Sequence, residues 1–483
     1  MNMKKTIVAV VIIAWIITSA RFMYDDSSVT PTVQDTWSKN EVVQYWFAVD
    51  HNEWEGTVHR INLTPHEQPI RFFDNITQTT LRSYSTWAKP ILIRATQWDI
   101  LEVKVTNTLN QETSVHWHGI RVPNKQDGVP WVTQEPIAAW DTYTYRFPVN
   151  DAGTFFFHPH INTVEQMGRW LYGILIVEPK IYPFTFDQEL VRALKDYRLN
   201  RDWTLNENFE SMMDFTHGWR LWNLLTINNK VSPTYKVPAW STSLIRIINP
   251  SNARIYNFDL RSRNAQVVWV DWGLVAQPYD AWLLEIGPWE RIDILVSIGK
   301  KTLKVIDNYF PTKPYQLATI SPIWQEQNNW FDIDTDWFPA IPDRSYLRNQ
   351  EPDEIISLGW IGVMWWDRGM MMGSSAERWW TINDGIRPST NKVLHRKLGE
   401  MRIVRLENKS RRDHPMHLHG DFFQVLWVNW KEVPWHWWKD TINVPPQGYI
   451  DLAIIPTNKG TWMFHCHIIE HAHFGMMTTV VVE

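Results

Sequence analysis

The chain of 483 residues is 44% hydrophobic and 20% charged, which is typical of a globular protein too long for one hydrophobic core. Three domains of about 150 residues each are the first expectation. The net charge of −5 argues against a nucleic-acid partner, which favours a basic surface. The single cysteine, Cys466, excludes an intramolecular disulfide.

The N-terminus has the pattern of an export signal. Lys4 and Lys5 precede an apolar run over residues 6–20 that ends in small residues. The run is short for a membrane-spanning helix, which favours a signal peptide over the alternative of an uncleaved membrane anchor. We predict a signal peptide at 1–20, a tail or linker at 21–40 and an exported protein.

An alternating segment then occurs three times along the chain. Residues 98–107 (WDILEVKVTN), 240–249 (WSTSLIRIIN) and 399–408 (GEMRIVRLEN) each begin at a turn position and end in Asn. Their alternation of apolar and polar residues predicts a β-strand in each copy.

Histidine motifs accompany only the first and third copies. HxHG begins nine residues after the Asn, at His116 and at His417, and GTFFFHPH (153–160) and GTWMFHCH (460–467) follow later. Long helical periodicity is scarce, and turn signals separate short apolar runs. The pattern predicts an all-β chain of three β-sandwich domains with metal ligands in the outer two. Their expected limits are 41–180, 181–345 and 346–483.

Ten of the chain's 17 histidines lie in four tight clusters. A lone HxH pair is a weak signal, because surface strands often carry one, but four clusters in matching repeat positions indicate metal binding. The clusters are His116 and His118; His158 and His160; His414, His417 and His419; and His465, His467 and His471.

Cys466 lies between His465 and His467. Side chains alternate along a strand, so the two imidazoles would project to one face and the thiol to the other, and one strand could serve two metal sites. A thiolate, two imidazoles and a weak thioether, here Met476, form the ligand set of a blue-copper site. A buried free thiol beside surface histidines is the ordinary alternative.

These motifs resemble those of the three-domain multicopper oxidases, the family of laccases and bacterial copper-efflux oxidases. The similarity runs from about residue 85 to the C-terminus and is strongest in HWHGIRVPNKQDGVP (116–130), GTFFFHPHINTVEQMGR (153–169), HPMHLHGDFFQV (414–425) and the C-terminal motif. It implies cupredoxin-like Greek-key sandwiches and four copper ions: one type 1, one type 2 and two type 3.

The resemblance also implies a ligand set. Type 1 copper would take His414, Cys466 and His471, with Met476 as axial ligand. Type 2 copper would take His116 and His417. The type 3 pair would take His118, His158 and His467 on one ion and His160, His419 and His465 on the other.

The implied reaction couples one-electron oxidation of a donor to four-electron reduction of O2 to water. The exposed edge of the residue matching His471 is where the electron usually enters in the family. Asp127 matches an acidic position near the trinuclear cluster, although a turn aspartate in QDG is an equal alternative. Ala472 stands where many bacterial relatives have a glutamate, which leaves one proton route in doubt.

The donor is open between a phenol and a metal ion. Met364 and Met370–Met372 precede the third domain, and thioethers bind Cu(I), so cuprous oxidation is one expectation. Met often only fills gaps in a core, which is the plainer interpretation. A non-enzymatic exported copper-sequestering protein, active in copper resistance, is the alternative function.

The 32 tryptophans against 20 glycines are abnormal. Many occupy turn positions where the family has glycine, and a bulky residue at φ > 0 is strained by about 1–3 kcal/mol. A dozen such sites would exceed the stability of a typical domain. We hypothesise that these tryptophans stand for UGA codons that the source reads as glycine. The positions are Trp98, Trp131, Trp170, Trp219, Trp222, Trp240, Trp272, Trp289 and Trp430. A genuinely tryptophan-rich protein with aromatic surface patches for substrate is the alternative.

Overall fold

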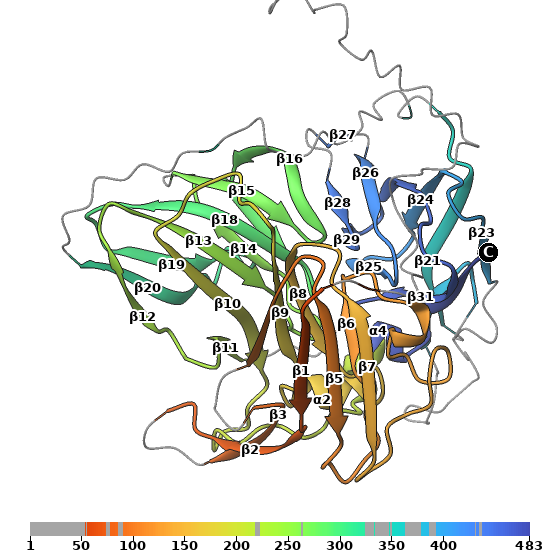
Figure 1. The fold of residues 1–483 in the computed structure, drawn as a ribbon, viewed down its shortest axis with the longest axis horizontal. Coiled ribbons are helices and arrows are strands. Elements are labelled where there is room, and N and C mark those ends of the chain that lie inside the picture. Colours follow the sequence, from red (N-terminus) through yellow and green to blue (C-terminus); the bar gives the residue numbers. More distant parts are fainter. Residues whose placement is uncertain are drawn as a thin grey trace, which may run out of the picture. The chain divides into compact units, whose positions relative to one another are not determined.

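Nearly all the regular structure in the computed structural model is β, as predicted. Three pairs of sheets follow one another along the chain (Figure 1). The structure describes residues 54, 56–73, 78–85, 90–217, 223–261, 264–323, 333, 347, 350–362, 378–385, 393–429, 431–433 and 437–483.

The first sandwich pairs the sheet β1-β5-β7 with the sheet β4-β9-β8-β6. Trp117, Phe155 and Phe157 fill the apolar core between them. Its elements are β1 (Val58–Leu63), β2 (His66–Ile70), β3 (Thr79–Ser83), β4 (Ile91–Thr96), β5 (Ile100–Thr106), β6 (His116–His118), η1 (Asn124–Gln126), β7 (Thr142–Pro148), β8 (Gly153–His158), α2 (Thr163–Gly168) and β9 (Gly173–Glu178).

The second sandwich pairs the sheet β11-β10-β13-β18-β15-β16 with the sheet β12-β20-β19-β14-β17 around its own core. Its elements are β10 (Gln188–Tyr197), α3 (Met212–His217), β11 (Leu224–Ile227), β12 (Thr234–Pro238), β13 (Ser241–Ile248), β14 (Tyr256–Asp259), β15 (Ala265–Val270), β16 (Gly273–Asp280), β17 (Leu283–Ile286), β18 (Arg291–Ile298), β19 (Leu303–Asp307) and β20 (Tyr315–Ile323).

The third sandwich pairs the sheet β22-β21-β24-β30-β26-β27, with β28 beside β26, and the sheet β23-β32-β31-β25-β29. Its elements are β21 (Glu354–Gly362), β22 (Arg378–Ile382), β23 (Leu394–Arg396), β24 (Arg402–Asn408), β25 (His414–Leu418), β26 (Phe423–Val428), β27 (Lys431–Glu432), β28 (Trp438–Lys439), β29 (Thr441–Val444), β30 (Tyr449–Ile454), β31 (Gly460–Cys466), α4 (Ile469–His473) and β32 (Met477–Val482).

The three sequence repeats form equivalent strands, β5, β13 and β24. Each terminal Asn (107, 249 and 408) donates its side-chain amide to three backbone carbonyls further along the chain, one within five residues and two about 30 to 40 residues later. Asparagine recurs there because one amide group satisfies several otherwise unpaired buried carbonyls.

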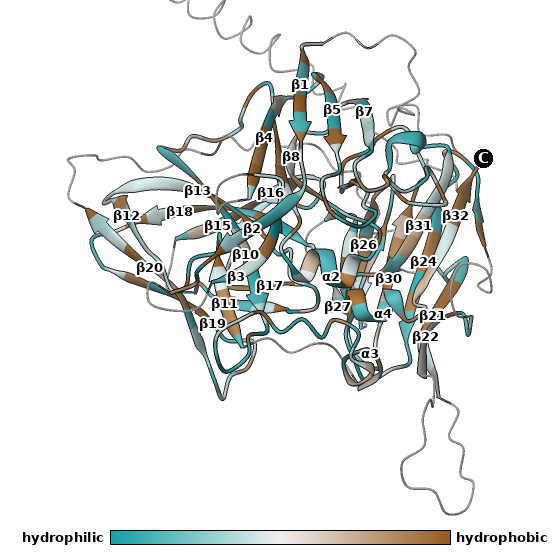
Figure 2. Ribbon diagram, turned by 90° about the horizontal axis from the view of Figure 1, so that it is seen from below, coloured by the Kyte–Doolittle hydropathy of each residue, from teal (hydrophilic) through white to brown (hydrophobic). Residues whose placement is uncertain are grey.

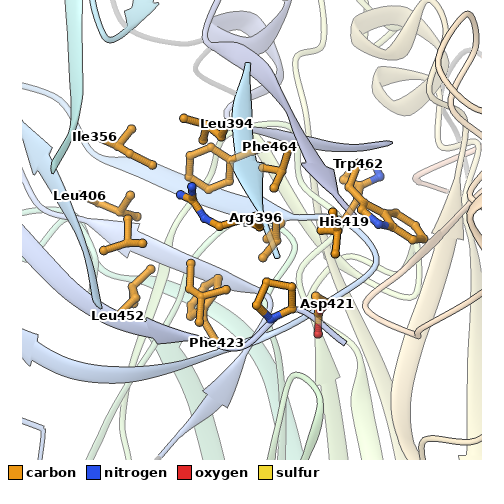
Figure 3. Close-up of a pocket in the computed structure, with 16 residues that line it drawn as sticks. Ile356, Leu394, Arg396, Leu406, His419, Asp421, Phe423, Leu452, Trp462 and Phe464 are labelled. Atoms are coloured by element: carbon orange, nitrogen blue, oxygen red, sulfur yellow. The ribbon is translucent and has the colours of Figure 1, made fainter. Parts of the chain in front are cut away.

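Hydrophobic residues concentrate on the strands, as on β4 and β24 in Figure 2. In β4, Ile93 and Ala95 are buried and their neighbours are not, the alternation that a half-buried strand requires. A void of about 30 Å³ remains inside the third core, among Ile356, Leu406 and Leu452 (Figure 3). It can hold only about one or two waters, so it is a packing defect and not a substrate site.

Several predictions fall on residues that the structure does not describe. These are the signal at 1–20, the tail at 21–40, the limit at 345 and the methionines at 364 and 370–372. The limit at 180 falls between β9 and β10. Within the described part of the chain, no helix has the length and apolarity needed to cross a bilayer.

Candidate metal centre

One thiol and two imidazoles converge at the end of β31. Sγ of Cys466 lies 3.7 Å from Nδ1 of His414 and 3.7 Å from Nδ1 of His471, and the two Nδ1 atoms are 3.1 Å apart. His414 comes from β25 and His471 from α4. Met476 is buried in the same core, and its carbonyl accepts the backbone N–H of Cys466.

Burial sets the protonation of this triangle. It lowers the pKa of His414 to about 3 and raises the pKa of the Cys466 thiol, so the imidazole is neutral and a metal must displace the thiol proton. The expected exposed edge of His471 is not found. The residue is buried, and the Trp380 ring covers it at a centroid distance of 3.9 Å.

The histidine clusters of the first and third sandwiches meet. The rings of His118 and His417 stack at 3.9 Å, as do those of His116 and His419. Within each sandwich, strand pairing sets the partners, because β6 places His116 opposite His158 and β25 places His417 opposite His465. Histidines far apart in the sequence therefore line one chamber.

Several of these imidazoles have one nitrogen anchored and the other without a partner. Nδ1 of His116, His158 and His417 lies 2.8–2.9 Å from a backbone carbonyl, while their Nε2 atoms are buried without a partner. An anchored imidazole with a free, neutral nitrogen is the state in which a histidine binds a metal. Burial, followed by the neighbouring imidazoles, lowers the pKa of His118, His158, His160, His419 and His467 well below the ordinary value.

The ligand atoms converge at most of the predicted copper positions, but at one position they do not. His160, His419 and His465 form a group whose atoms lie within 4.8 Å of one another, as do His116, His118 and His417. The predicted trio of His118, His158 and His467 forms no such group among the described residues.

The non-convergent trio is looser and touches an indole ring. Its ring centroids are 4.9–6.0 Å apart, against 5.0–5.1 Å for His160, His419 and His465. The ring of Trp289 lies 4.2 Å from that of His158 and 4.6 Å from that of His467.

Comparison with known proteins agrees with this centre. Profiles of the family described as multicopper oxidase match residues 75–181 and 367–483. The multicopper oxidase MmcO of Mycobacterium tuberculosis is 27% identical over 454 residues, which cover 86% of this chain and 85% of that protein.

Two solved structures match in fold and sequence. The multicopper oxidase of Pseudomonas thermotolerans superposes with a TM-score of 0.76 at 27% identity, covering 89% of this chain and all of the other. A Campylobacter jejuni multicopper oxidase described as a metallo-oxidase gives 0.73 at 26% identity, covering 93% and 96%.

The chain belongs to the multicopper oxidases. It is therefore an oxidoreductase that uses O2, and its sandwiches are cupredoxin-like. Members of the family use four copper ions of types 1, 2 and 3, and the histidine clusters are compatible with that complement.

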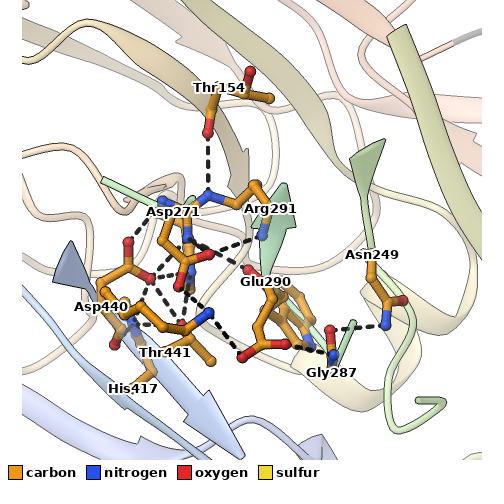
Figure 4. Close-up of polar contacts among 12 residues, drawn as sticks. Thr154, Asn249, Asp271, Gly287, Glu290, Arg291, His417, Asp440 and Thr441 are labelled. Atoms are coloured by element: carbon orange, nitrogen blue, oxygen red, sulfur yellow. Dashed lines mark hydrogen bonds and ion pairs between the residues drawn. The ribbon is translucent and has the colours of Figure 1, made fainter. Parts of the chain in front are cut away.

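A buried ion network joins the second sandwich of this multicopper oxidase to the chamber (Figure 4). Arg291 donates two hydrogen bonds to Asp440, at 2.8 and 2.6 Å. Oδ1 of Asp440 in turn lies 3.2 Å from Nε2 of His118 and 3.4 Å from Nδ1 of His417. Burial opposes the charge of Asp440, but Arg291 and the hydrogen bonds from these imidazoles hold the pKa of its carboxyl well below its usual range.

This network explains the glycine of the first HxHG motif. Gly119 has φ +84°, and a Cβ there would lie 2.1 Å from the Arg291 guanidinium. Gly420, in the second motif, has φ +71°, and a Cβ there would lie 2.3 Å from the Trp462 ring. Both motifs end in glycine because the backbone is left-handed and has no room for a side chain.

Asp127 lies inside the chamber. Its Oδ2 is 2.9 Å from Nδ1 of His419, its Oδ1 is 3.2 Å from Nδ1 of His116, and its side chain is buried. A turn aspartate alone would face solvent, so the position favours a role beside the histidines.

Asp127→Ala is expected to lower turnover by about 10- to 100-fold, because partners that orient metal-binding histidines have effects of this size. O2 uptake at saturating donor measures the loss, and copper content per chain shows whether metal was lost with it. Asp141→Ala, at an exposed carboxylate, is the control. Equal rates for the two variants would remove Asp127 from the site.

A cavity of about 730 Å³ runs beside the chamber. Ala472 and His473 line it, and so do five candidate ligands: His158, His160, His465, Cys466 and His467. Trp131, at 70% exposure, marks its outer rim. The side chain of Ala472 is a methyl group, so it cannot carry protons through this cavity.

Sequence patterns did not indicate Arg291, Asp440 or Trp380. The hydroxyl of Thr441, 3.1 Å from Nδ1 of His417, was missed as well. None belongs to a histidine motif, and Arg291 lies in the second sandwich, which lacks those motifs. What distinguishes these residues is that they are buried and paired with one another or with the histidines. Because burial cannot be read from the sequence, no sequence signal could have identified them.

Proposed function

We propose that this multicopper oxidase oxidises a phenolic or metal-ion donor, Cu(I) included, one electron at a time and reduces O2 to water. The structure supports two linked sites for the two half-reactions. Bound copper would supply single-electron chemistry at the first and four-electron storage at the second.

The proposed ligands follow the observed clusters. His414, Cys466 and His471 would hold type 1 copper with Met476 as a weak fourth ligand. His116 and His417 would hold type 2 copper. The type 3 ions would take His160, His419 and His465, and His118, His158 and His467.

The arrangement of β31 carries this proposal. The Cys466 thiol lies with His414 and His471, while His465 lies with His160 and His419. Adjacent residues of one strand therefore belong to two sites, which gives electrons a covalent route between them. A protein that only sequesters copper has no use for such a route.

The protein controls how the donor's electron arrives. His471 is buried beneath Trp380, whose Nε1 donates to the carbonyl of Phe215 at 2.8 Å and so holds the ring in place. We expect an electron from a surface donor to reach His471 through this indole.

Export is proposed on the charged and apolar pattern of residues 1–20. Bacterial and fungal multicopper oxidases are often exported. An exported oxidase would meet extracellular or periplasmic phenols and metal ions before they enter the cell.

The deciding experiment measures O2 consumption by copper-loaded protein with Cu(I) and, separately, with a phenol. We expect visible thiolate–copper absorption and steady turnover with at least one donor, and none from the metal-free protein. Copper binding without O2 consumption with either donor would favour the sequestering protein instead.

A further inference from the structure

Tryptophan is the commonest residue other than glycine in left-handed backbone in the described part of this chain. Seven of the sixteen such residues are tryptophans, and most of the others are Asn or Asp. Asn and Asp tolerate this region because their short side chains hydrogen-bond locally, whereas a bulky aromatic residue there is an outlier. The tryptophans are Trp98, Trp131, Trp140, Trp170, Trp203, Trp240 and Trp289, with φ between 63° and 80°.

The internal repeat provides a direct comparison. Trp98, Trp240 and Gly399 begin the three equivalent segments, with φ of 80°, 64° and 73°. The backbone N–H of each donates across to a carbonyl, that of Val149, Ile298 and Pro456 respectively. The same backbone geometry is thus built three times, and glycine, which alone adopts it freely, stands in one copy.

The backbone at position 289 is held in place by its neighbours. The N–H of Trp289 donates to the carbonyl of Asn249 at 2.7 Å, and the N–H of Gly287 donates to the Glu290 carboxylate at 2.6 Å. Asn249 and Glu290 are themselves buried. The chain therefore cannot relax from the left-handed conformation to suit the side chain.

The side chain at 289 enters the chamber of histidines. Its fully buried ring lies against His158 and His467, two members of the one predicted trio whose nitrogens do not converge. Among the described residues, the mirrored trio of His160, His419 and His465 has no indole ring against it, and its nitrogens converge. An indole at 289 thus takes the space in which those imidazoles would turn toward a shared ion.

We propose that the functional protein carries glycine at position 289, and also at 98, 131, 140, 170, 203 and 240. The tryptophans printed at these positions would then be translations of UGA codons that the source reads as glycine. UGA differs from the glycine codon GGA at one base. Position 289 is then a positioning residue whose missing side chain lets His118, His158 and His467 approach one another. This last step rests on the proposed copper site, whereas the residue identities do not.

Not every tryptophan has a left-handed backbone, so the proposal does not extend to all of them. Trp272, one of the hypothesised glycines, does not have a left-handed backbone, and its ring stacks on Phe422 at 3.9 Å. Trp117 and Trp462 also lie outside the left-handed set and fill the first and third cores. Trp219, Trp222 and Trp430 lie outside the described residues.

Peptide sequencing by mass spectrometry of the protein purified from its source tests the residue identities. We expect glycine at 289 and at the other six left-handed positions, with tryptophan at 117 and 462 as internal controls. The peptide that ends at Arg291 contains position 289. Tryptophan at 289 and 240 in the native protein would overturn the proposal.

Three recombinant chains test the role of position 289: the printed sequence, Trp289→Gly and Trp240→Gly. Trp240→Gly relieves the same backbone conformation far from the histidines and is the matched control. We expect a higher copper content per chain, by elemental analysis, for Trp289→Gly alone. Equal copper content in all three chains would overturn the positioning role, while no copper in any chain would count against the proposed function and leave the mass spectrum to decide the residue identities.

Discussion

Replacing Cys466 by serine is expected to abolish the visible absorption of the copper-loaded protein and to reduce O2 uptake to background. The thiolate is the strongest donor in the triangle with His414 and His471, and its neighbour on β31, His465, belongs to the second site. Absorption spectra and O2 uptake with the preferred donor measure the two effects. The serine hydroxyl would also be buried in an apolar core, which costs about 1–3 kcal/mol if the hydroxyl is unpaired.

Met476→Leu is the matched control for this variant. It changes a buried neighbour of similar volume and leaves the thiolate and both imidazoles in place. We expect it to keep the visible absorption with a shifted maximum and to keep turnover. Retention of full turnover by Cys466→Ser would refute the proposed electron route.

Replacing Arg291 by alanine is expected to destabilise the protein by about 3–5 kcal/mol, because it leaves the buried Asp440 carboxylate without its cationic partner. Arg291 donates two hydrogen bonds to Asp440 and lies 3.4 Å from Asp271, and all three side chains are fully buried. Since Asp440 also contacts His118 and His417, copper content should fall as well. Urea unfolding at constant m-value measures the free energy of unfolding.

Arg261→Ala provides the comparison. Arg261 pairs with Asp259, but both side chains are exposed, so water screens the pair. We expect no measurable change in its unfolding midpoint or copper content. If the two arginine variants unfold at the same urea concentration, the buried network contributes nothing to stability.

The architecture was predictable because its signals are local. Alternation over 98–107, 240–249 and 399–408 indicated strands, and β5, β13 and β24 form there. Strand pairing then places His116 opposite His158 and His417 opposite His465. The excess of tryptophan at turn positions was also visible in the sequence, and five of the six described positions named on that basis have a left-handed backbone.

The surroundings of the histidines were decided by tertiary structure alone. Asp440 and Arg291 come from different sandwiches and meet only when those sandwiches pack, so no periodicity or spacing announces them. The burial of His471 under Trp380 and the entry of Trp289 between His158 and His467 arise in the same way. Sequence by itself determined which residues can bind copper, because ligand chemistry and strand alternation are properties of short segments. Packing between distant segments determined which of those ligands converge, because the space around a buried side chain belongs to the whole fold.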